Sequence, residues 1–370
     1  MTSRRPEPVD VTILTSGHDV ADARLHREAA ALIAAGLRVE VLGLGDAAGA
    51  PPGTEVTTWP RVGGAARAGL ATRMAARARG RVLFTLDPDS ALAAHAVVLA
   101  SGRELVVDVH EDYAALLADR AWTSRAHGLA GRAAGQLVSS FQRIAGRAAL
   151  TVVADEHVPP LRARRRLVVP NLPDPAMLPQ PGEPAARPLA LYVGDLRASR
   201  GLFAMIEAVA AAPDWHLQLV GPVAPADEPR LRERLETDPD LAARVELRGR
   251  LAPRQAWEQA ASAWCGLLLL SDTPAFREAL PSKVGEYLAC GLPVLTTDLP
   301  RQAALVREAN AGVVLPCGED AAVTEAVARQ LQAWAQDPSS LHALRPAAAA
   351  AGATEQSPYA ELAAAVADLL

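Results

Sequence analysis

One short segment, residues 276–295 (FREALPSKVGEYLACGLPVL), holds the residues best suited to bind an anionic ligand. Lys283 is the only lysine in a chain of 370 residues whose other basic side chains are all arginine. It lies between two carboxylates, Glu278 and Glu286. We expect a helix over 282–290, which places Lys283 in the first turn, where exposed backbone N–H groups also attract phosphate. Glu286 follows three residues later and shares the same helix face.

This arrangement predicts a site for a nucleoside diphosphate. The ammonium and the helix N-terminus suit the two phosphates, and the Glu286 carboxylate suits the two hydroxyls of a ribose. Glu278, in the loop before the helix, is then available to bind a group beyond the phosphates, such as a sugar. The alternative is an ordinary cluster of solvated salt bridges between Lys283 and the two glutamates.

A second group of polar residues follows the apolar run ELVVDVH (104–110). His110 ends this expected strand, with Asp108 just before it and Glu111 and Asp112 just after it. Histidine is the side chain best suited to proton transfer and hydrogen bonding near neutral pH, and the carboxyl end of a strand is where functional residues gather. A hydrogen-bonded loop or core histidine is the alternative.

The elements that must position these residues form two α/β series. Runs rich in Val, Ile and Leu alternate with helical segments, a pattern typical of parallel sheets that are buried on both faces. In the first half we expect strands at 9–16, 38–45, 81–86, 104–110 and 150–154. In the second half we expect them at 189–196, 216–222, 244–251, 266–272, 292–298 and 311–316.

A proline-dense stretch at 167–188 separates the two series. We therefore predict two domains, 1–172 and 173–356, followed by an amphipathic helix at 357–370 whose return to the first domain is left open. In doubly wound domains ligands bind at the carboxyl ends of the strands, so an active site is expected between the two domains.

Composition limits the class of protein. Residues 1–172 carry 21 Arg against 17 acids and residues 173–370 carry 16 Lys+Arg against 25 acids, so +4 and −9 sum to the net charge of −5. Three scattered cysteines favour neither a disulfide framework nor a metal site, and no apolar run is long enough to span a membrane. We expect a cytoplasmic, metal-independent protein that binds no nucleic acid, since aromatic residues are only 4% of an acidic chain.

Basic stretches nevertheless occur in the first half: six Arg and no acid between 61 and 81, and LRARRR at 161–166. They predict either a solvated surface in an arginine-rich chain or peripheral contact with an anionic membrane at its inner face.

Three motifs together resemble the retaining family-4 glycosyltransferases of the GT-B fold. They are the E-x7-E pair before EYLACGLPVL, the segment YVGDLRASRGL, and VVDVHEDY. The resemblance runs over nearly the full length, and VADARLHREAAALIAAGLRVEVLGLG resembles one branch of the family. It implies two doubly wound Rossmann-like domains that face each other across an inter-domain cleft.

The resemblance also implies roles in binding the donor, a nucleotide-diphosphate sugar linked to UDP or GDP. Glu286 is expected at the ribose and Glu278 at the sugar. In the pattern G-R-L-x-x-x-K-G, which binds the diphosphate, the chain has Arg200 at the lysine position and Asp195 at the arginine position. A carboxylate cannot bind phosphate, so Lys283 is expected to take that role, with Arg197 as a further candidate.

The remaining site residues follow from the same resemblance. Gly17 and Gly194 are expected in loops beside the donor phosphates, and Gly249 beside the base. His110 is expected near the transferred sugar. On the acceptor side we expect Asp22, Arg24 and Asp112, although Asp22 and Arg24 also suit simple helix-start electrostatics, and Gly17 an ordinary turn.

The sequence thus predicts a retaining hexosyltransferase in which His110, Glu278, Lys283 and Arg200 are catalytic. The acceptor is expected to be a small molecule or a lipid-linked hydroxyl compound. Three alternatives stay open: a nucleotide-sugar epimerase or phosphorylase on the same fold, a non-catalytic GT-B protein that acts as a binding partner, and, more distantly, a dehydrogenase.

Overall fold

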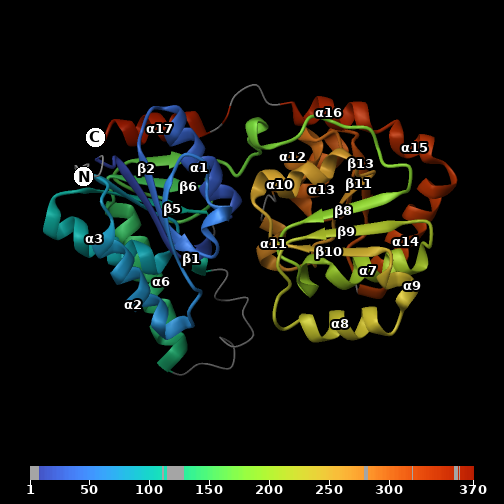
Figure 1. Ribbon diagram of the computed structural model, residues 1–370, viewed down its shortest axis with the longest axis horizontal. Coiled ribbons are helices and arrows are strands. Elements are labelled where there is room, and N and C mark those ends of the chain that lie inside the picture. The colour runs from blue at the N-terminus through green and yellow to red at the C-terminus, as the bar shows by residue number, and fades with distance from the viewer. Residues whose placement is uncertain are drawn as a thin grey trace, which may run out of the picture. The chain divides into compact units, whose positions relative to one another are not determined.

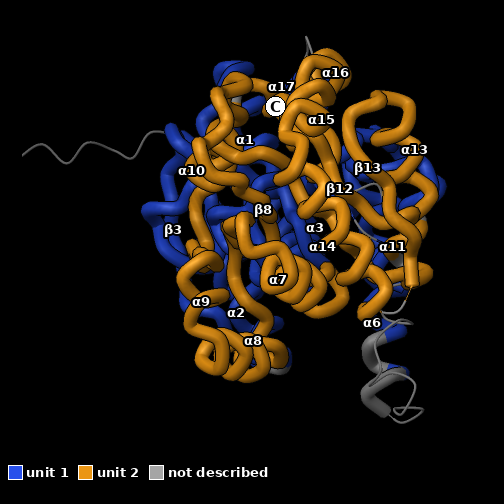
Figure 2. Tube along the Cα trace, turned by 90° about the vertical axis from the view of Figure 1, so that its right-hand side faces the viewer, with its two compact units in different colours: residues 1–171, 358–370 blue, residues 172–357 orange. Residues whose placement is uncertain are grey.

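The computed structural model describes residues 8–110, 112–114, 129–278, 282–318, 320–353, 357 and 359–370. The chain divides into two compact units (Figure 1 and Figure 2). Unit 1 contains Met1–Asn171 and Pro358–Leu370, and unit 2 contains Leu172–Ser357.

Unit 1 is built on a seven-stranded sheet in the order β3-β2-β1-β4-β5-β6-β7, with all pairs parallel. The central strand β1 is buried along its first six residues, as expected for a strand covered on both faces. The strands are β1 (Val11–Asp19), β2 (Val39–Leu44), β3 (Glu55–Trp59), β4 (Val82–Thr85), β5 (Glu104–Val109), β6 (Leu150–Val153) and β7 (Arg166–Val168).

Helices cover both faces of this sheet, and successive residues of β1 enter separate cores. Ile13 packs in one core with residues of α1 (Ala23–Ala34) and α17 (Tyr359–Ala367). Leu14 packs in the other, with residues of the helices on the opposite face. These are α2 (Gly64–Arg77), α3 (Pro88–Ser101) and α6 (Leu129–Arg147), and a 3₁₀ turn, η1 (Ala47–Gly49), follows β2. The C-terminal helix α17 therefore returns to unit 1, where it packs on α1 (Figure 1).

Unit 2 repeats the plan with a six-stranded parallel sheet in the order β10-β9-β8-β11-β12-β13. Its strands are β8 (Leu189–Val193), β9 (His216–Val220), β10 (Val245–Gly249), β11 (Cys265–Leu268), β12 (Val294–Thr297) and β13 (Gly312–Leu315). Its α-helices are α7 (Leu202–Ala211), α8 (Glu228–Glu236), α9 (Pro239–Ala242), α10 (Pro253–Glu258), α11 (Pro274–Glu278), α12 (Ser282–Ala289), α13 (Pro300–Glu308), α14 (Asp320–Gln336), α15 (Pro338–His342) and α16 (Arg345–Gly352). The 3₁₀ turns are η2 (Pro175–Met177), η3 (Ala198–Arg200) and η4 (Gln259–Ala261).

The predicted α/β class with two parallel sheets is confirmed, and each expected strand is present. Two strands were not expected: β3 and β7 lie at the two edges of the first sheet and carry polar residues, so they lack the apolar run of a central strand. Residues 228–242 form two helices, because Pro239 begins a new helix that Asp238 caps.

One local prediction was wrong. Glu278 was expected in a loop, but its backbone ends a short helix, α11. Thr273 begins this helix: its hydroxyl accepts a hydrogen bond from the Phe276 N–H at 3.3 Å, its carbonyl accepts one from Arg277 at 3.0 Å, and Pro274 occupies the first turn. The Glu278 side chain lies outside the described residues.

Candidate functional site

In unit 2, the tip of β8 brings two of the predicted donor residues into contact. Gly194 has φ +143°, a backbone conformation that residues other than glycine rarely adopt. A Cβ at this position would lie only 2.4 Å from Lys283 Cε and 2.9 Å from its Nζ. The lysine side chain of α12 thus extends directly over the glycine, and the missing side chain makes room for it.

Arg200 reaches the same place from η3. Its charge acts on the Tyr192 hydroxyl, which donates a hydrogen bond to the Asp195 carbonyl at 3.1 Å. The Tyr192 oxygen would lie 3.3 Å from a Cβ at Gly194, next to Lys283. Burial raises the pKa of Tyr192, and the charge of Arg200 partly offsets this effect, so the phenol stays neutral and protonated. Two positive groups therefore converge at the carboxyl end of β8.

Asp195, the departure from the family pattern, is paired with arginine on two sides. Its carboxylate is 3.1 Å from Arg197 Nη2 and 3.7 Å from Arg250 Nη2. Arg250 was not among the predicted site residues. It directly follows Gly249, which has φ +64° and accepts a hydrogen bond from the Gly221 N–H at 2.8 Å. Its only signal in the sequence was its place in LRGRL, beside a predicted residue.

Glu286 lies in α12, one turn after Lys283, with a relative exposure of 5%. Ser282 donates a hydrogen bond to its Oε2 at 3.1 Å. The carboxylate is thus held by the first residue of its own helix. Glu278, predicted beside it, contributes no described side chain.

We expect Gly194→Ala to weaken nucleotide binding strongly, because an alanine Cβ collides with Lys283 and requires a rare backbone conformation. Backbone strain of this kind costs about 1–3 kcal/mol. Calorimetric titration with a nucleoside diphosphate measures the loss of affinity, and thermal unfolding measures the loss of stability caused by the backbone strain. Gly64→Ala is the matched control, since nothing lies within 4 Å of the Cβ position there. An unchanged dissociation constant for Gly194→Ala would contradict the assignment of this turn to the nucleotide site.

In unit 1, His110 directly follows β5 and contacts a buried carboxylate. Its Nδ1 is 3.1 Å from Asp108 Oδ2. Asp108 is fully buried and also accepts two hydrogen bonds from Arg24, each 2.7 Å long: Nε to Oδ2 and Nη2 to Oδ1. Burial alone would raise the pKa of Asp108, but Arg24 and His110 outweigh it and hold the pKa below its ordinary value.

Arg24 lies beneath the surface and is 5% exposed. Besides Asp108, its guanidinium donates to the Val169 carbonyl at 3.4 Å and lies 3.1 Å from Glu28 Oε1. The acceptor-side role of Arg24 stays a prediction; in the structure its guanidinium contacts Asp108, which in turn contacts His110. The sequence did not reveal this pairing because Arg24 and Asp108 are 84 residues apart.

Glu28 is the least satisfied carboxyl group of this cluster. Neither of its oxygens accepts a hydrogen bond within the described part of the chain, because the single Nε hydrogen of Arg24 is donated to Asp108. Burial and the nearby charge of Asp108 raise the pKa of Glu28 well above its ordinary value. Burial thus favours the protonated acid over the carboxylate at this position.

We expect Glu28→Gln to leave the free energy of unfolding unchanged or to raise it at pH 7. A raised pKa in the folded state means that Glu28 supports folding fully below the unfolded pKa of about 4.3, and loses that support as the pH rises. A neutral glutamine does not titrate, so it avoids this decrease in the free energy of unfolding, which is up to ~1.4 kcal/mol per pH unit. Urea unfolding between pH 5 and 8, with exposed Glu361→Gln as control, should show the difference growing with pH. A destabilised and pH-independent Glu28→Gln would contradict a protonated Glu28.

The other residues predicted for unit 1 surround His110 or the end of β1. Asp22 caps α1 by accepting from the Arg24 and Leu25 N–H groups, and it lies 3.4 Å from His18 Nδ1. Burial alone would raise the pKa of Asp22. Its hydrogen bonds and the charges of His18 and His110 outweigh burial and lower this pKa far below its ordinary value. The His18 ring meets the His110 ring edge-on, with centroids 5.1 Å apart. His18 was not predicted.

Gly17, near the end of β1, rests on a second buried carboxylate, Asp87. One oxygen of Asp87 accepts from the Ser16 N–H at 2.9 Å and from the Gly17 N–H at 3.3 Å. Asp87 also caps α3. Burial alone would raise the pKa of Asp87, but the charges of His18 and Arg67 lower it below its ordinary value. This support for the Gly17 loop was missed because DPDS at 87–90 reads as a simple helix start. Asp112 accepts from the Ala114 N–H at 2.9 Å and so shapes its own turn.

The predicted residues thus form two groups, each at the carboxyl ends of the strands in its own unit. Unit 2 holds Gly194, Arg197, Arg200, Gly249, Lys283 and Glu286, and unit 1 holds Gly17, Asp22, Arg24, His110 and Asp112. Among the described residues there is no group of three or more His, Cys, Asp or Glu side chains placed to hold a metal ion. Within that same part of the chain, no helix has the length and apolar character needed to cross a membrane.

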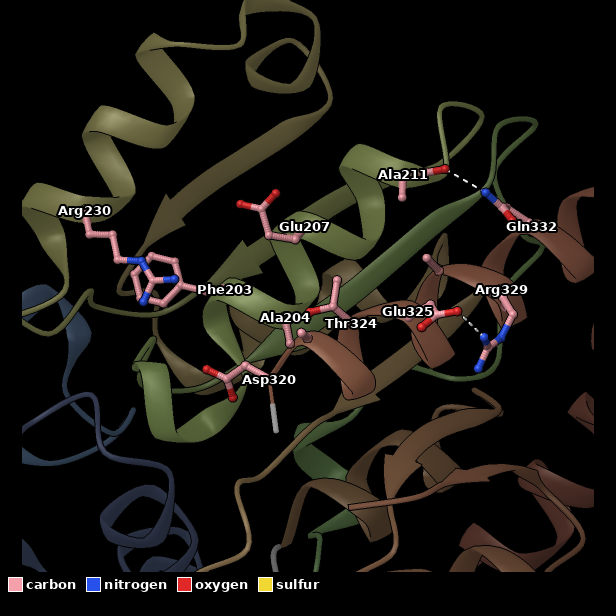
Figure 3. Close-up of a pocket in the computed structure, with 12 residues that line it drawn as sticks. Phe203, Ala204, Glu207, Ala211, Arg230, Asp320, Thr324, Glu325, Arg329 and Gln332 are labelled. Carbon is pink, nitrogen blue, oxygen red and sulfur yellow. Dashed lines mark hydrogen bonds and ion pairs between the residues drawn. The ribbon is translucent and has the colours of Figure 1, made fainter. Parts of the chain in front are cut away.

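A hollow of about 590 Å³ lies elsewhere on unit 2, between α7 and α14 (Figure 3). Arg230 stacks over the Phe203 ring there, with its guanidinium carbon 3.7 Å from the ring centre. The hollow includes none of the predicted site residues. This hollow is therefore separate from the candidate site at the carboxyl ends of the strands in unit 2.

Comparison with solved structures defines the class of fold. The chain is similar to sucrose-phosphate synthase from Thermosynechococcus elongatus (TM-score 0.66, 16% identity, 93% of this chain and 94% of that chain). It is also similar to Anabaena HepE in complex with UDP-glucose (0.66, 17%, 98% and 100%) and to WaaG, a glycosyltransferase involved in lipopolysaccharide biosynthesis (0.63, 20%, 96% and 98%). The predicted GT-B fold is confirmed.

The sequence match is to a family. Residues 187–333, all within unit 2, match the family model described as glycosyl transferases group 1. This confirms the prediction of a glycosyltransferase. The matched range includes Gly194, Arg200, Lys283 and Glu286. No curated protein sequence matches the chain.

Proposed function

We propose that the chain is a retaining, metal-independent family-4 glycosyltransferase that moves a sugar from a nucleotide-diphosphate sugar to an acceptor hydroxyl. The observation that carries this proposal is the convergence of Lys283 and Arg200 beside the side-chain-free turn at Gly194. Positive groups at a strand end, next to a glycine that lets a ligand approach the backbone, suit a diphosphate.

Lys283 and Arg200 would stabilise the negative charge that grows on the diphosphate as the bond to the sugar breaks. Such electrostatic stabilisation is commonly the largest contribution to this type of transfer. The acceptor would attack from the side that the diphosphate leaves, and a phosphate oxygen would take the acceptor proton. No side-chain base is then needed.

Other residues would bind and orient the substrates. Glu286, held by Ser282, would accept hydrogen bonds from the ribose hydroxyls, and Gly249 would adjoin the base. Arg197, steadied by Asp195, would add positive charge near the diphosphate. Glu278 and His110 would contact the sugar.

The donor is proposed to be linked to UDP in the first place and to GDP in the second. HepE, to which the chain is similar over 98% of its length, has been crystallised with UDP, with UDP and glucose, and with UDP-glucose. The acceptor would bind to unit 1 near Gly17, Asp22 and Asp112, and is proposed to be a small molecule or a lipid-linked compound. The arginines of α2 would favour peripheral contact with an anionic membrane on the cytoplasmic side.

Thermal unfolding with a panel of nucleoside diphosphates and nucleotide sugars, without added metal, tests the donor site. A ligand at 100 times its dissociation constant adds about 2.7 kcal/mol of apparent stability. We expect a clear shift with one nucleotide, which is smaller in Lys283→Ala and in Glu286→Ala. No shift with any nucleotide would overturn the proposal, and binding without transfer to any acceptor would favour a non-catalytic protein.

A further inference from the structure

The polar cluster behind His110 determines what the imidazole can do. We propose that Arg24 and Asp108 are positioning residues that hold His110 as the neutral Nδ1–H tautomer, so that its Nε2 accepts a hydrogen bond from a hydroxyl of the bound sugar. This inference rests on the proposed function for the identity of the sugar, but its structural part can be tested without any substrate.

The first step concerns the proton between His110 and Asp108. Both oxygens of Asp108 accept hydrogen bonds of 2.7 Å from Arg24, so the carboxylate is ionised and has no hydrogen to donate. The 3.1 Å contact between Asp108 Oδ2 and His110 Nδ1 must then be a hydrogen bond donated by Nδ1. Because a neutral imidazole carries one hydrogen, Nε2 is left with its lone pair.

The second step concerns the charge of the ring. A buried carboxylate beside a histidine usually favours the imidazolium. Here Arg24 already neutralises Asp108 through two hydrogen bonds, and Glu28, the other acid of the cluster, accepts no hydrogen bond in the described part of the chain and has its pKa raised by burial. In the described part of the chain, the titratable and charged groups around His110 include His18, Asp22, Arg24, Glu28, Asp108 and Tyr113. Asp22, whose charge remains, is 3.4 Å from His18 Nδ1.

The third step concerns access. The His110 side chain is 16% exposed, and the described part of the chain makes no hydrogen bond to its Nε2. His18 and Tyr113 meet the ring edge-on, at centroid distances of 5.1 and 6.3 Å, and so limit its rotation. The ring is thus fixed in orientation at a strand end, with one nitrogen directed at Asp108 and the other left for a ligand.

Nitrogen-15 NMR of the histidine rings in the ligand-free, full-length protein tests this directly. His110→Gln assigns the signal, and Arg38→Gln, which alters an exposed ion pair with Asp10, is the control. We expect a protonated Nδ1 and an unprotonated Nε2 for His110 at pH 7.5 in the wild type. In Arg24→Gln the pH midpoint of His110 should rise by about one unit or more, because Asp108 loses its countercharge.

Observation of the Nε2–H tautomer or of an imidazolium in the wild type would overturn the proposal, as would an unchanged midpoint in a folded Arg24→Gln. The wild-type spectrum decides the matter should Arg24→Gln not fold. Asp108→Asn provides a second test, since its amide can also donate to Nδ1 and should give a mixture of tautomers. Nucleoside diphosphate titration of the same samples tests the donor site separately, so a wrong tautomer and a wrong function are distinguishable.

Activity gives a further readout. In Arg24→Gln the acidic limb of the pH profile of kcat should move to higher pH, while the dissociation constant of the nucleoside diphosphate stays within about twofold of the wild-type value. A purely structural role for Arg24 would instead lower the amount of active protein and leave the pH profile in place.

Discussion

Lys283→Ala is expected to lower kcat/KM for sugar transfer by a factor of about 10²–10³, the typical effect of removing one group that stabilises developing negative charge. The Lys283 side chain lies over Gly194, close to the Tyr192 hydroxyl on which the charge of Arg200 also acts. Without Lys283, one of the two cations that converge at this turn is lost, and Arg200 remains. Because the charge grows as the bond breaks, kcat should fall more than KM rises.

Arg329→Ala is the matched control, since it removes a cation from an exposed ion pair with Glu325 on α14. Lys283→Arg distinguishes charge from shape: the guanidinium keeps the charge but is too large for the space above Gly194, so only a small part of the activity should return. Full activity in Lys283→Ala would mean that the lysine belongs to an ordinary salt bridge.

The single lysine permits an independent experiment on the unmodified protein. An amine-reactive acetylating reagent can modify only Lys283 and the chain's terminal amine, and peptide mass mapping separates the two. We expect a saturating nucleoside diphosphate to protect Lys283 and not the terminal amine. Equal labelling of Lys283 with and without nucleotide would place the ligand elsewhere.

Much of the fold could be predicted because parallel strands buried on both faces leave continuous apolar runs in the sequence. The same logic identified the strand end at His110, whereas Gly194 was predicted from the resemblance to the family-4 glycosyltransferases. Apolar runs did not reveal the edge strands β3 and β7, since a strand at the edge of a sheet can carry polar residues. Glu278 was misplaced because Thr273 and Pro274, a helix start, were read as part of a loop.

The candidate site was predictable where its residues adjoin in the sequence, and not where they meet only in the fold. Lys283 and Glu286 share one helix, and their spacing alone places them together. Arg24 and Asp108 come from α1 and β5, and nothing local to either residue indicates a pair. On its own, Arg24 beside Asp22 reads as a charged helix start, which is why its burial behind His110 emerged only from the structure.

Asp108→Ala is expected to be among the most damaging substitutions for stability. It leaves the buried guanidinium of Arg24 without its bidentate partner, and removing one member of a buried ion pair typically costs about 3–5 kcal/mol. The lowered pKa of Asp108 means that its contribution is present above the ordinary aspartate pKa of about 4 and is lost as the pH falls through the folded value. Urea unfolding at pH 7 and near pH 2 should therefore show a smaller difference from the wild type at the lower pH, below the ordinary aspartate pKa and close to the folded value of about 2.

Glu28 determines how large this loss is. Its Oε1 is 3.1 Å from Arg24 Nε, so once Asp108 is removed Glu28 can ionise and accept the freed hydrogen. Glu28→Gln should then change sign with its background: neutral or stabilising in the wild type, and destabilising by at least ~1 kcal/mol in Asp108→Ala. The double-mutant cycle measures this coupling. Additive effects would mean that Asp108 and Glu28 do not compete for Arg24. A sign reversal would mean that both acids can pair with the Arg24 guanidinium and that Asp108 is its partner in the native protein.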